Sequence, residues 1–351
     1  MYSTMKLLPL ILLVACSQID DTTKLQRMPP KKISTTQSQL KILKILAHEK
    51  AENSVVLLVP LSGANKALGQ DILNACLLDN NDSHTDFYVL DSESEDFENL
   101  QTKFPNLRAV IGPVFSHETH RFSTMFPQVP IFSLSNNADI SNTHVFACGI
   151  SPQDELKAMF TFAKNFRKQG LIIILPEDDQ NNQLVQLIQR HANLAGFSEE
   201  SIMSIKFNTK EMNSICDFLR ANQNQIIFSM VPTCNFEQCV EDVPIFAFSA
   251  QVLSNPKIWN NAIFAQPETE SQKEFVDKYK AAYGETPSII AIIAKDLMNA
   301  INESYPNSKE LLDETYHGML GEFKFVNNQG VVRNFSLFRM EDGEKVRAYD
   351  D

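Results

Sequence analysis

Small polar side chains follow several apolar runs of the sequence, and such places suit ligand binding. Residues 108–137, RAVIGPVFSHETHRFSTMFPQVPIFSLSNN, hold two apolar runs with an amphipathic stretch between them. Parallel strands joined by a crossover helix would bring the residues after both runs to one sheet edge, where open α/β sheets bind ligands. Turn and capping chemistry is the alternative use of the same side chains. The candidate cleft-lining residues in the first half of the chain are Ser62, Ser116, Ser135, Asn136 and Asn137.

The histidines nearest to these residues do not stand at catalytic spacing. His117 and His120 flank Glu118, but a metalloprotease helix needs two histidines four residues apart, and here the spacing is three. We therefore expect solvated or capping side chains at these positions, with Ser116 as the natural N-cap of the helix that follows.

An acidic loop offers the other catalytic possibility. Glu177, Asp178 and Asp179 follow the apolar run LIIILP and could supply a pair of carboxylates. Adjacent loop residues usually splay apart, and the N-terminus of the next helix itself favours acids, so capping is the expected role. Asp178 remains a cleft candidate, together with Gln251, which follows the run VPIFAFS.

The composition excludes several function classes. The formal net charge is −12 and the sequence shows no cluster of Lys and Arg, so nucleic acid is not expected as a partner. The chain has only 11 glycines and contains no Walker loop, dinucleotide fingerprint or Gly-x-Ser-x-Gly nucleophile elbow. We therefore expect neither a cofactor nor an enzymatic activity.

The N-terminus predicts export. MYSTMK precedes the apolar run LLPLILLVA, which is too short to span a bilayer as a mature helix, and Cys16 follows. Residues 13–16 resemble the lipobox of bacterial lipoproteins, in which cleavage leaves a lipidated cysteine; a plain signal peptide is the alternative. By the same resemblance, Ser17 implies sorting to the outer membrane. We expect a signal peptide over residues 1–15, then a lipidated N-terminus and a tether over residues 16–50.

The five cysteines after Cys16 cannot form a complete disulfide framework because their number is odd. Cys234 and Cys239 lie in the polar loop VPTCNFEQCVED, where an oxidising compartment could close them into a disulfide. Free thiols are the alternative, and zinc is not expected because no further Cys or His stands at ligand spacing. The other three lie in apolar patterns and are expected to be buried thiols: Cys76, Cys148 and Cys216.

Most of the remaining sequence alternates between strand and helix patterns. A short helix is expected over residues 39–50, QLKILKILAHEK, and the alternation starts at Ser54. It restarts after Ile150, so two similar units follow one another. Such alternation predicts parallel strands with helices on both faces. Two long helical patterns, KEFVDKYKAAYG and IIAIIAKDLMNAI, and a hairpin, GEFKFVNNQGVVRNFSLFRM, end the chain. This tail must pack on the two units, which favours two lobes crossed more than once by the chain, with a cleft between them.

Several stretches, in the right order, resemble type I periplasmic binding proteins of the Leu/Ile/Val-binding kind. VVLLVPLSGANKALGQDILNA is similar to their opening strand, turn and helix, and IGPVFS with VPIFSLSNN to their next ligand-facing turns. FACGISPQDE resembles the crossing into their second lobe. The resemblance implies an α/β fold of two lobes, each a parallel sheet flanked by helices. It places lobe 1 at residues 51–150 plus 267–325 and lobe 2 at residues 151–266 plus 326–351.

Two branches of that family fit different parts of the sequence. In the amino-acid-binding branch, a Tyr-Gly turn of lobe 2 helps to hold the ligand, and here Glu177, Asp178 and Asp179 stand in its place. Lipoproteins similar to penicillin-binding-protein activators share the lipobox, the tether, the IGP turn and the WNNAIFAQP segment. The resemblance therefore implies a non-enzymatic envelope protein whose partner is a peptidoglycan synthase. The alternative is an ABC-transporter substrate-binding protein whose small-molecule ligand is an amino acid or small amide.

Overall fold

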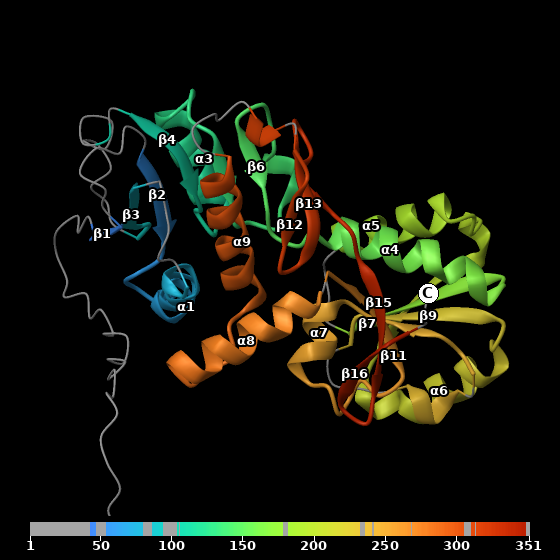
Figure 1. Cartoon of the computed structure of the whole chain (residues 1–351). Helices are drawn as coiled ribbons and strands as arrows, with labels where there is room; N and C mark the ends of the chain where they lie inside the picture. The colour runs from blue at the N-terminus through green and yellow to red at the C-terminus, as the bar shows by residue number, and fades with distance from the viewer. Residues whose placement is uncertain are drawn as a thin grey trace, which may run out of the picture. The chain divides into compact units, whose positions relative to one another are not determined.

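The computed structural model describes residues 43–46, 54–79, 86–93, 104, 106–177, 182–231, 236–240, 242–267, 269–304, 310–312 and 314–348. In these residues strands alternate with helices, and the strands form two large sheets and one small sheet (Figure 1). The predicted α/β class, with parallel sheets flanked by helices, is confirmed.

The first large sheet has six strands in the order β1-β3-β2-β4-β5-β6. From β2 to β6 the neighbours pair in parallel, and the apolar runs of these strands are buried on both faces, as a parallel sheet requires. Helix α1 connects β2 to β3, and α3 connects β4 to β5. The elements are β1 (Leu43–Leu46), β2 (Ser54–Val59), α1 (Lys66–Leu77), β3 (Asp86–Asp91), β4 (Leu107–Ile111), α3 (Ser116–Met125), β5 (Ile131–Ser133) and β6 (Val145–Ala147).

Strand β1 corrects one prediction. A helix is expected over residues 39–50, but Leu43–Leu46 forms a strand that pairs antiparallel with β3. The run LKILKIL fits a helical and an alternating period equally well, so local pattern does not decide between them. Pairing with the open edge of a sheet, which is a tertiary interaction, decides for the strand.

The second large sheet has seven strands in the order β16-β15-β11-β10-β9-β7-β8. Strands β7 to β11 are parallel, whereas β15 and β16 are antiparallel additions. Alternate residues of β7 enter different cores, with Ile173 packed among residues of α4 and α5 and Ile172 among residues of α6. The elements are α4 (Pro152–Ala163), β7 (Gly170–Pro176), α5 (Asn182–Leu194), β8 (Ile202–Phe207), α6 (Met212–Ala221), β9 (Gln225–Ser229), β10 (Ile245–Phe246), α7 (Ser249–Ser254), β11 (Ala262–Gln266), β15 (Ser336–Glu341) and β16 (Glu344–Arg347).

The chain then returns to the core of the six-stranded sheet. Helices α8 (Glu270–Tyr283) and α9 (Ile289–Glu303) confirm the two predicted long helices, and β13 (Gly321–Val326) with β14 (Gly330–Arg333) confirms the predicted hairpin. With β12 (Tyr316–Gly318) they form the small sheet. Phe325 of β13 lies 4.7 Å from Phe132 between ring centroids, so the small sheet shares the core of the six-stranded sheet.

The chain passes three times between the two large sheets, after β6, after β11 and after β14. This connectivity is that of a two-lobed protein. The lobe boundaries at residues 150, 266 and 325 stay predictions. Short 3₁₀ segments complete the described elements: η1 (Ala138–Ile140), η2 (Lys164–Phe166), η3 (Glu199–Ser201), η4 (Thr209–Glu211), η5 (Glu237–Cys239) and η6 (Glu310–Leu312).

Candidate functional site

Three turns that carry candidate residues lie at one edge of the six-stranded sheet. Strands β2, β4 and β5 are neighbours and run in parallel, so their carboxyl ends share that edge. The turns after them carry Ser62, Ser116 and the group Ser135, Asn136 and Asn137. The structure thus brings these five residues to the edge at which open α/β sheets bind ligands. Their contact with a ligand stays a prediction.

The turn after β2 is held by close backbone packing. The N–H of Leu61 donates a hydrogen bond of 2.8 Å to Oδ1 of Asp91, at the end of the neighbouring strand β3. Gly69 of α1 lies so close to the strand end that a Cβ there would stand 1.8 Å from the carbonyl oxygen of Pro60. Only glycine lets the first turns of α1 approach the strand in this way. Ser62 is half-buried in this turn.

The turn after β4 also depends on a glycine. Gly112 has φ of +98°, and a Cβ there would lie 2.0 Å from the carbonyl oxygen of Leu58; its peptide bond to Pro113 is cis. Helix α3 then begins at Ser116, with Phe115 in the extended N-cap position and no capping hydrogen bond from a side chain. The prediction of Ser116 as the N-cap is therefore wrong, because the backbone turns into the helix one residue earlier.

A buried pair of hydroxyls lies behind this edge. Oγ1 of Thr119 and Oγ of Ser133 are 2.7 Å apart, and the Ser133 hydroxyl also lies 3.2 Å from the carbonyl oxygen of Pro113. Both residues are almost fully buried. They tie α3 to the end of β5 and thereby set the positions of the two turns. The sequence predicts neither residue, although a serine inside the apolar run VPIFSLS is the signal that points to one of them.

The turn after β5 uses its own polar side chains. The backbone N–H of Asn137 donates to Oγ of Ser135 at 3.1 Å, and the N–H of Asp139 donates to Oδ1 of Asn137 at 3.1 Å. Ser135 is buried, whereas Asn136 and Asn137 are exposed. Turn chemistry therefore occupies one acceptor of Ser135 and one of Asn137, as the alternative reading of the sequence expects.

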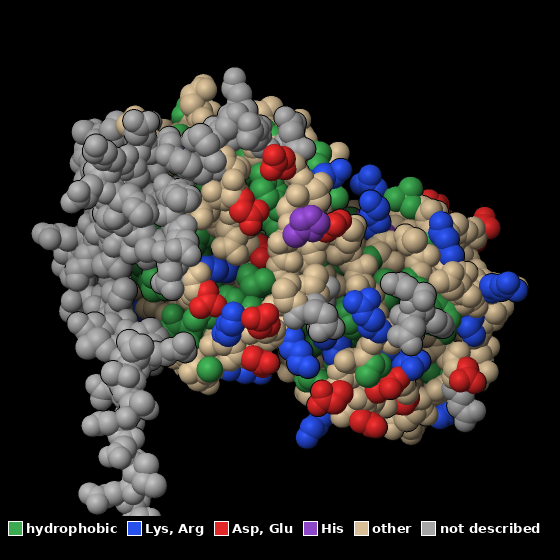
Figure 2. Space-filling view, viewed as in Figure 1, with side chains coloured by type: hydrophobic (Ala, Val, Ile, Leu, Met, Phe, Trp, Pro, Cys, Tyr) green, Lys and Arg blue, Asp and Glu red, His purple; other side chains and the backbone are tan. Residues whose placement is uncertain are grey.

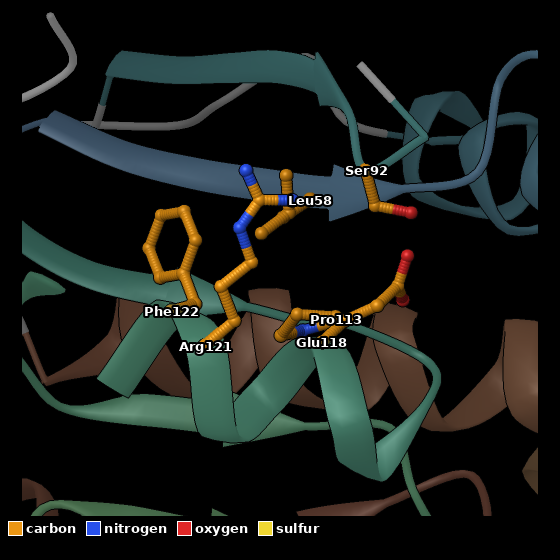
Figure 3. A pocket seen from close by; sticks show the side chains of 6 residues that line it. All are labelled: Leu58, Ser92, Pro113, Glu118, Arg121 and Phe122. Atoms are coloured by element: carbon orange, nitrogen blue, oxygen red, sulfur yellow. The ribbon is translucent and has the colours of Figure 1, made fainter. Parts of the chain in front are cut away.

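A small cavity lies at the same edge, between α3 and the carboxyl ends of β2 and β3 (Figure 3). Its volume is about 20 Å³, room for about one water molecule. The hydroxyl of Ser92 and the carboxylate of Glu118 point toward each other across it, and Arg121 and Phe122 line its other end. Burial raises the pKa of Glu118. The small space and its two facing polar groups suit a bound water molecule.

The candidates from the second unit are less informative. Asp178 lies outside the described residues. Gln251, in α7, is half-buried and donates from Nε2 to the carbonyl oxygen of Met230 at 2.9 Å, whereas its Oε1 is buried and has no hydrogen-bond partner among the described residues. The sequence does not point to Glu155, a buried residue of α4 that contacts the same helix as Gln251. Its carboxylate accepts a 2.8 Å hydrogen bond from the N–H of Ser249, the first residue of α7. Burial raises the pKa of Glu155 to about 7.

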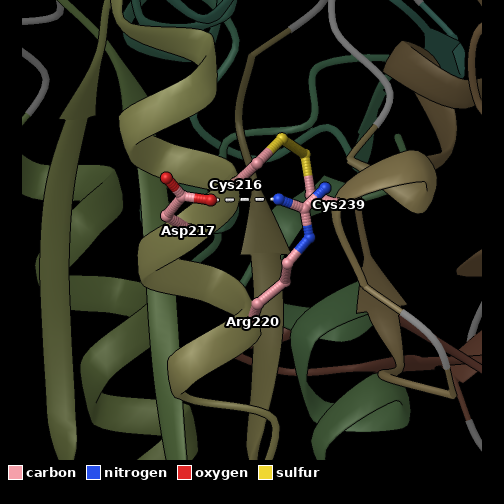
Figure 4. The surroundings of a disulfide bond; sticks show 4 residues. All are labelled: Cys216, Asp217, Arg220 and Cys239. Atoms are coloured by element: carbon pink, nitrogen blue, oxygen red, sulfur yellow. Dashed lines mark hydrogen bonds and ion pairs between the residues drawn. A yellow bond between two sulfur atoms is a disulfide. The ribbon is translucent and has the colours of Figure 1, made fainter.

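The disulfide in the structure differs from the predicted one. Cys239 is bonded to Cys216 of α6, with a Cα–Cα distance of 4.6 Å, and not to Cys234, which lies outside the described residues (Figure 4). This pairing also corrects the prediction of a buried thiol at Cys216. The correction has a physical reason, because α6 and η5 cover the same face of the seven-stranded sheet and their apolar residues share one core. Cys76 and Cys148 are buried free thiols, as predicted. Cys16 lies outside the described residues.

The part of the chain that the structure describes contains no group of three or more His, Cys, Asp or Glu side chains that could hold a metal ion. Both histidines of the candidate motif, His117 and His120, are exposed. On the face shown in Figure 2, Lys and Arg side chains are interspersed with Asp and Glu. No helix among the described residues is both long and apolar enough to cross a membrane.

Comparison with known proteins rests on structure alone. No protein-family model matches the sequence, and no curated protein sequence matches it significantly. A protein from Rhodospirillum rubrum described as a branched-chain amino acid ABC transporter has a TM-score of 0.70 at 16% identity, with 84% of this chain and 99% of that chain covered. An ABC-transporter substrate-binding protein from Desulfitobacterium hafniense, in complex with Leu, has a TM-score of 0.61 at 16% identity, with 84% and 99% covered.

Full-length LpoA from Haemophilus influenzae is similar as well, with a TM-score of 0.65 at 17% identity, and 85% of this chain is covered. The alignment spans only 59% of LpoA, whereas it spans nearly the whole of the two transport proteins. At such identities the likeness defines the fold, which has two lobes with parallel sheets. The chain therefore has the type I periplasmic-binding-protein fold, shared by substrate-binding proteins and by LpoA.

Proposed function

We propose that this protein is a non-enzymatic lipoprotein of the cell envelope that regulates peptidoglycan synthesis, in the manner of the penicillin-binding-protein activators that its sequence resembles. One observation carries the proposal: three of the candidate ligand-holding side chains make hydrogen bonds inside the protein. Ser135 and Asn137 accept hydrogen bonds from their own turn, and Gln251 donates to the carbonyl oxygen of Met230. A polar edge that uses part of its hydrogen-bonding capacity within its own turns favours a scaffold for a protein partner over a dedicated small-molecule site.

Anchoring at Cys16 completes the proposal. A lipidated cysteine would hold the protein at the outer membrane, and residues 17–42, which precede β1, would act as the tether between membrane and folded body. This shortens the tether expected from sequence, because Leu43–Leu46 pairs with β3 in the six-stranded sheet. Several acyl chains, at about 0.8 kcal/mol per buried CH₂, make such anchoring essentially permanent. The Cys16→Ser variant tests this part, because it should appear in the soluble periplasmic fraction, whereas retention of the variant in the membrane would contradict the anchor.

The partner is tested by direct capture. The full-length tagged protein, crosslinked in intact cells and recovered from solubilised envelopes, should carry a peptidoglycan synthase. The synthase, purified, should then show a changed rate of glycan-strand synthesis or crosslinking when the full-length protein is added. Recovery of no synthase in the crosslinked fraction, together with an unchanged rate, would exclude the regulatory role.

A second candidate function is favoured by a different observation. The two similar transport proteins are matched over 99% of their length, so this fold contains the whole of a substrate-binding protein. In that case the protein would deliver an amino acid or small amide to an ABC transporter. A panel of amino acids tested by thermal shift decides between the two, since a rise of several degrees in Tm with one member would favour transport.

A further inference from the structure

A pocket large enough for a small molecule lies at the amino ends of β10 and β11, in the seven-stranded sheet. Its volume is about 310 Å³, at the lower end of the range of small-molecule sites. Ile245 and Ile263, near the starts of these strands, form part of its lining, and Phe166 of η2 forms another part. Ligands of this fold class bind at the carboxyl ends of strands, so this pocket is distinct from the turns described above.

The apolar part of the lining comes from both cores of the seven-stranded sheet. Phe166 and Ile263 belong to the core that contains residues of α4 and α5, whereas Val243 and Ile245 belong to the core that contains residues of α6. The ring of Phe166 packs edge-on against Phe246 of β10, at 6.1 Å between centroids, and this contact holds an aromatic surface beside the pocket. Because Phe166 and Val243 are only half-buried, the pocket lies where the two cores reach the surface without being fully covered.

Two ionic side chains of the lining already interact inside the protein. Both carboxylate oxygens of Glu237 accept hydrogen bonds from the side-chain amide of Asn260, at 3.2 and 3.1 Å, and its Oε1 also accepts one from the amide of Asn261. The guanidinium of Arg339, in β15, is paired with Glu341. A charged group of a ligand would have to compete with these interactions after losing its own hydration, which costs free energy.

The second acid of the described lining, Asp242, is exposed to solvent. An exposed ion pair changes an affinity by about fivefold at most. Each CH₂ group buried against an apolar lining changes it by about fourfold, and an aromatic ring brings several groups of this size. Burial of apolar surface therefore outweighs the charge of Asp242 in deciding which ligand the pocket prefers.

We propose that this pocket at the amino ends of β10 and β11 is a binding site for a small neutral aromatic molecule, whose ring lies against Phe166, Val243 and Ile263. The ring of Phe166 favours an aromatic ligand, because paired aromatic rings gain more than the burial of their area alone provides. The site goes beyond the proposed function and does not depend on it.

The test titrates the full-length protein, purified in detergent, with small probes and follows saturable binding by saturation-transfer NMR. Benzyl alcohol, 2-phenylethanol and 3-phenylpropanol form a neutral series, in which each added CH₂ should tighten binding by up to about fourfold. The charged analogues 3-phenylpropylamine and 3-phenylpropionate should bind no more than about fivefold tighter than 3-phenylpropanol, the limit that an exposed acid sets. A charged analogue that exceeds this limit would overturn the assignment of a neutral ligand, and an affinity that does not rise along the neutral series would overturn the role of apolar burial.

Two variants of the lining locate the binding. Val243→Trp adds bulk at a half-buried lining position and should abolish binding of 3-phenylpropanol, whereas Val332→Trp, at an exposed position in the small sheet, should not. Uptake of the probe by detergent is the same for both variants, so the difference between them reports the pocket. Phe166→Leu keeps an apolar side chain but removes the aromatic ring, and it should weaken binding about fivefold.

The outcomes that contradict the site are separate from those of the proposed function. Binding that survives Val243→Trp would place the probe elsewhere and would overturn the proposal, as would the absence of saturable binding of every probe. If Val243→Trp fails to fold, Phe166→Leu carries the same decision, because unchanged binding in that variant would exclude the ring contact. None of these outcomes depends on a synthase or on an amino-acid ligand.

Discussion

Asp71 in α1 accepts a hydrogen bond of 2.7 Å from the hydroxyl of Tyr279 in α8, a residue 208 positions later in the chain. Its other carboxylate oxygen accepts the N–H of Ser288, at 3.0 Å, where Ser288 caps the N-terminus of α9. One carboxylate therefore joins the first helix of the six-stranded unit to both helices that return to it. Through this carboxylate, α1 from the early part of the chain and α8 and α9 from its later part are held together in one core.

Removing the Asp71 carboxylate should destabilise the protein more than removing the Tyr279 hydroxyl. Tyr279→Phe loses one hydrogen bond, at about 1 kcal/mol, whereas Asp71→Ala loses two charge-assisted bonds and leaves the N–H of Ser288 without its partner, at about 3 kcal/mol. Urea unfolding at neutral pH measures both free energies. Tyr283→Phe, whose ring lies 4.8 Å from that of Tyr279, is the matched control for loss of a hydroxyl. Equal effects of the two tyrosine variants would contradict the assigned role of Tyr279.

Glu155 should make the stability of the protein depend on pH. Its pKa is raised by burial from 4.5 to about 7, so between these values the folded state binds more protons than the unfolded state. The free energy of unfolding therefore falls as pH rises through this window, by about 3 kcal/mol in all, and is level on either side. Burial raises the pKa of Asp296 to about 6, and its contribution has the same sign.

Glu155→Gln tests this dependence, because glutamine keeps an acceptor for the N–H of Ser249 and does not titrate. As the pH rises from 4.5 to 7.5, the free energy of unfolding of the variant should fall less steeply than that of the parent protein. The two values should be closest at the acidic end of this range. The exposed acid Glu199 supplies the control, since Glu199→Gln should leave the slope unchanged. A parent protein whose stability is flat or rises across this range would rule out the buried carboxyl as described.

The fold could be predicted from sequence because its strands are short apolar runs separated by amphipathic helices. The shortness of these runs and the turn residues beside them, and not a period, favour strands buried on both faces. Contacts between residues far apart in the sequence could not be predicted in this way. Cys216 and Cys239 meet because α6 and η5 cover the same sheet face, which no spacing in the sequence encodes. The same is true of Thr119 and Ser133, whose hydroxyls meet only when α3 packs on β5. The sequence locates the turns at the ends of its apolar runs, but their internal hydrogen bonds depend on backbone geometry.

The pairing of Cys239 with Cys216, in place of the predicted Cys234, can be tested directly. Non-reducing peptide mapping should yield a crosslinked pair containing Cys216 and Cys239, with Cys234 recovered as an alkylatable thiol. Cys216→Ser should lower the free energy of unfolding by about 3 kcal/mol, the entropic value for a loop closed over a separation of 23 residues. Cys234→Ser should leave stability unchanged under the same conditions. A crosslinked peptide joining Cys234 to Cys239 would instead support the pairing expected from sequence.

Arg333, in the strand just before the last crossing, is a buried cation with unusual surroundings. Its three guanidinium nitrogens are buried and make no hydrogen bond to any described residue, and its Cζ lies 4.7 Å from the centroid of the Phe323 ring. Burial lowers the pKa of Arg333, and the charge of Asp296 opposes that shift. Asp296 itself accepts the N–H groups of Met319 and Leu320, at 2.8 and 3.2 Å. Among the described residues the guanidinium gains no hydrogen bond in exchange for the hydration it loses, and this costs free energy.

Arg333→Met should therefore be neutral or should stabilise the protein by about 2 kcal/mol, because methionine keeps the packing on Phe323 and removes the buried charge. Asp296→Asn in the parent protein should destabilise by about 3 kcal/mol, since it removes the acid whose charge contributes most to stabilising the Arg333 cation. In the Arg333→Met background the same change should cost less, and a double-mutant cycle by urea unfolding measures the difference. If Arg333→Met alone destabilised the protein by several kcal/mol, the guanidinium would have to be held by favourable interactions, and the energetic argument from its missing hydrogen bonds would be wrong.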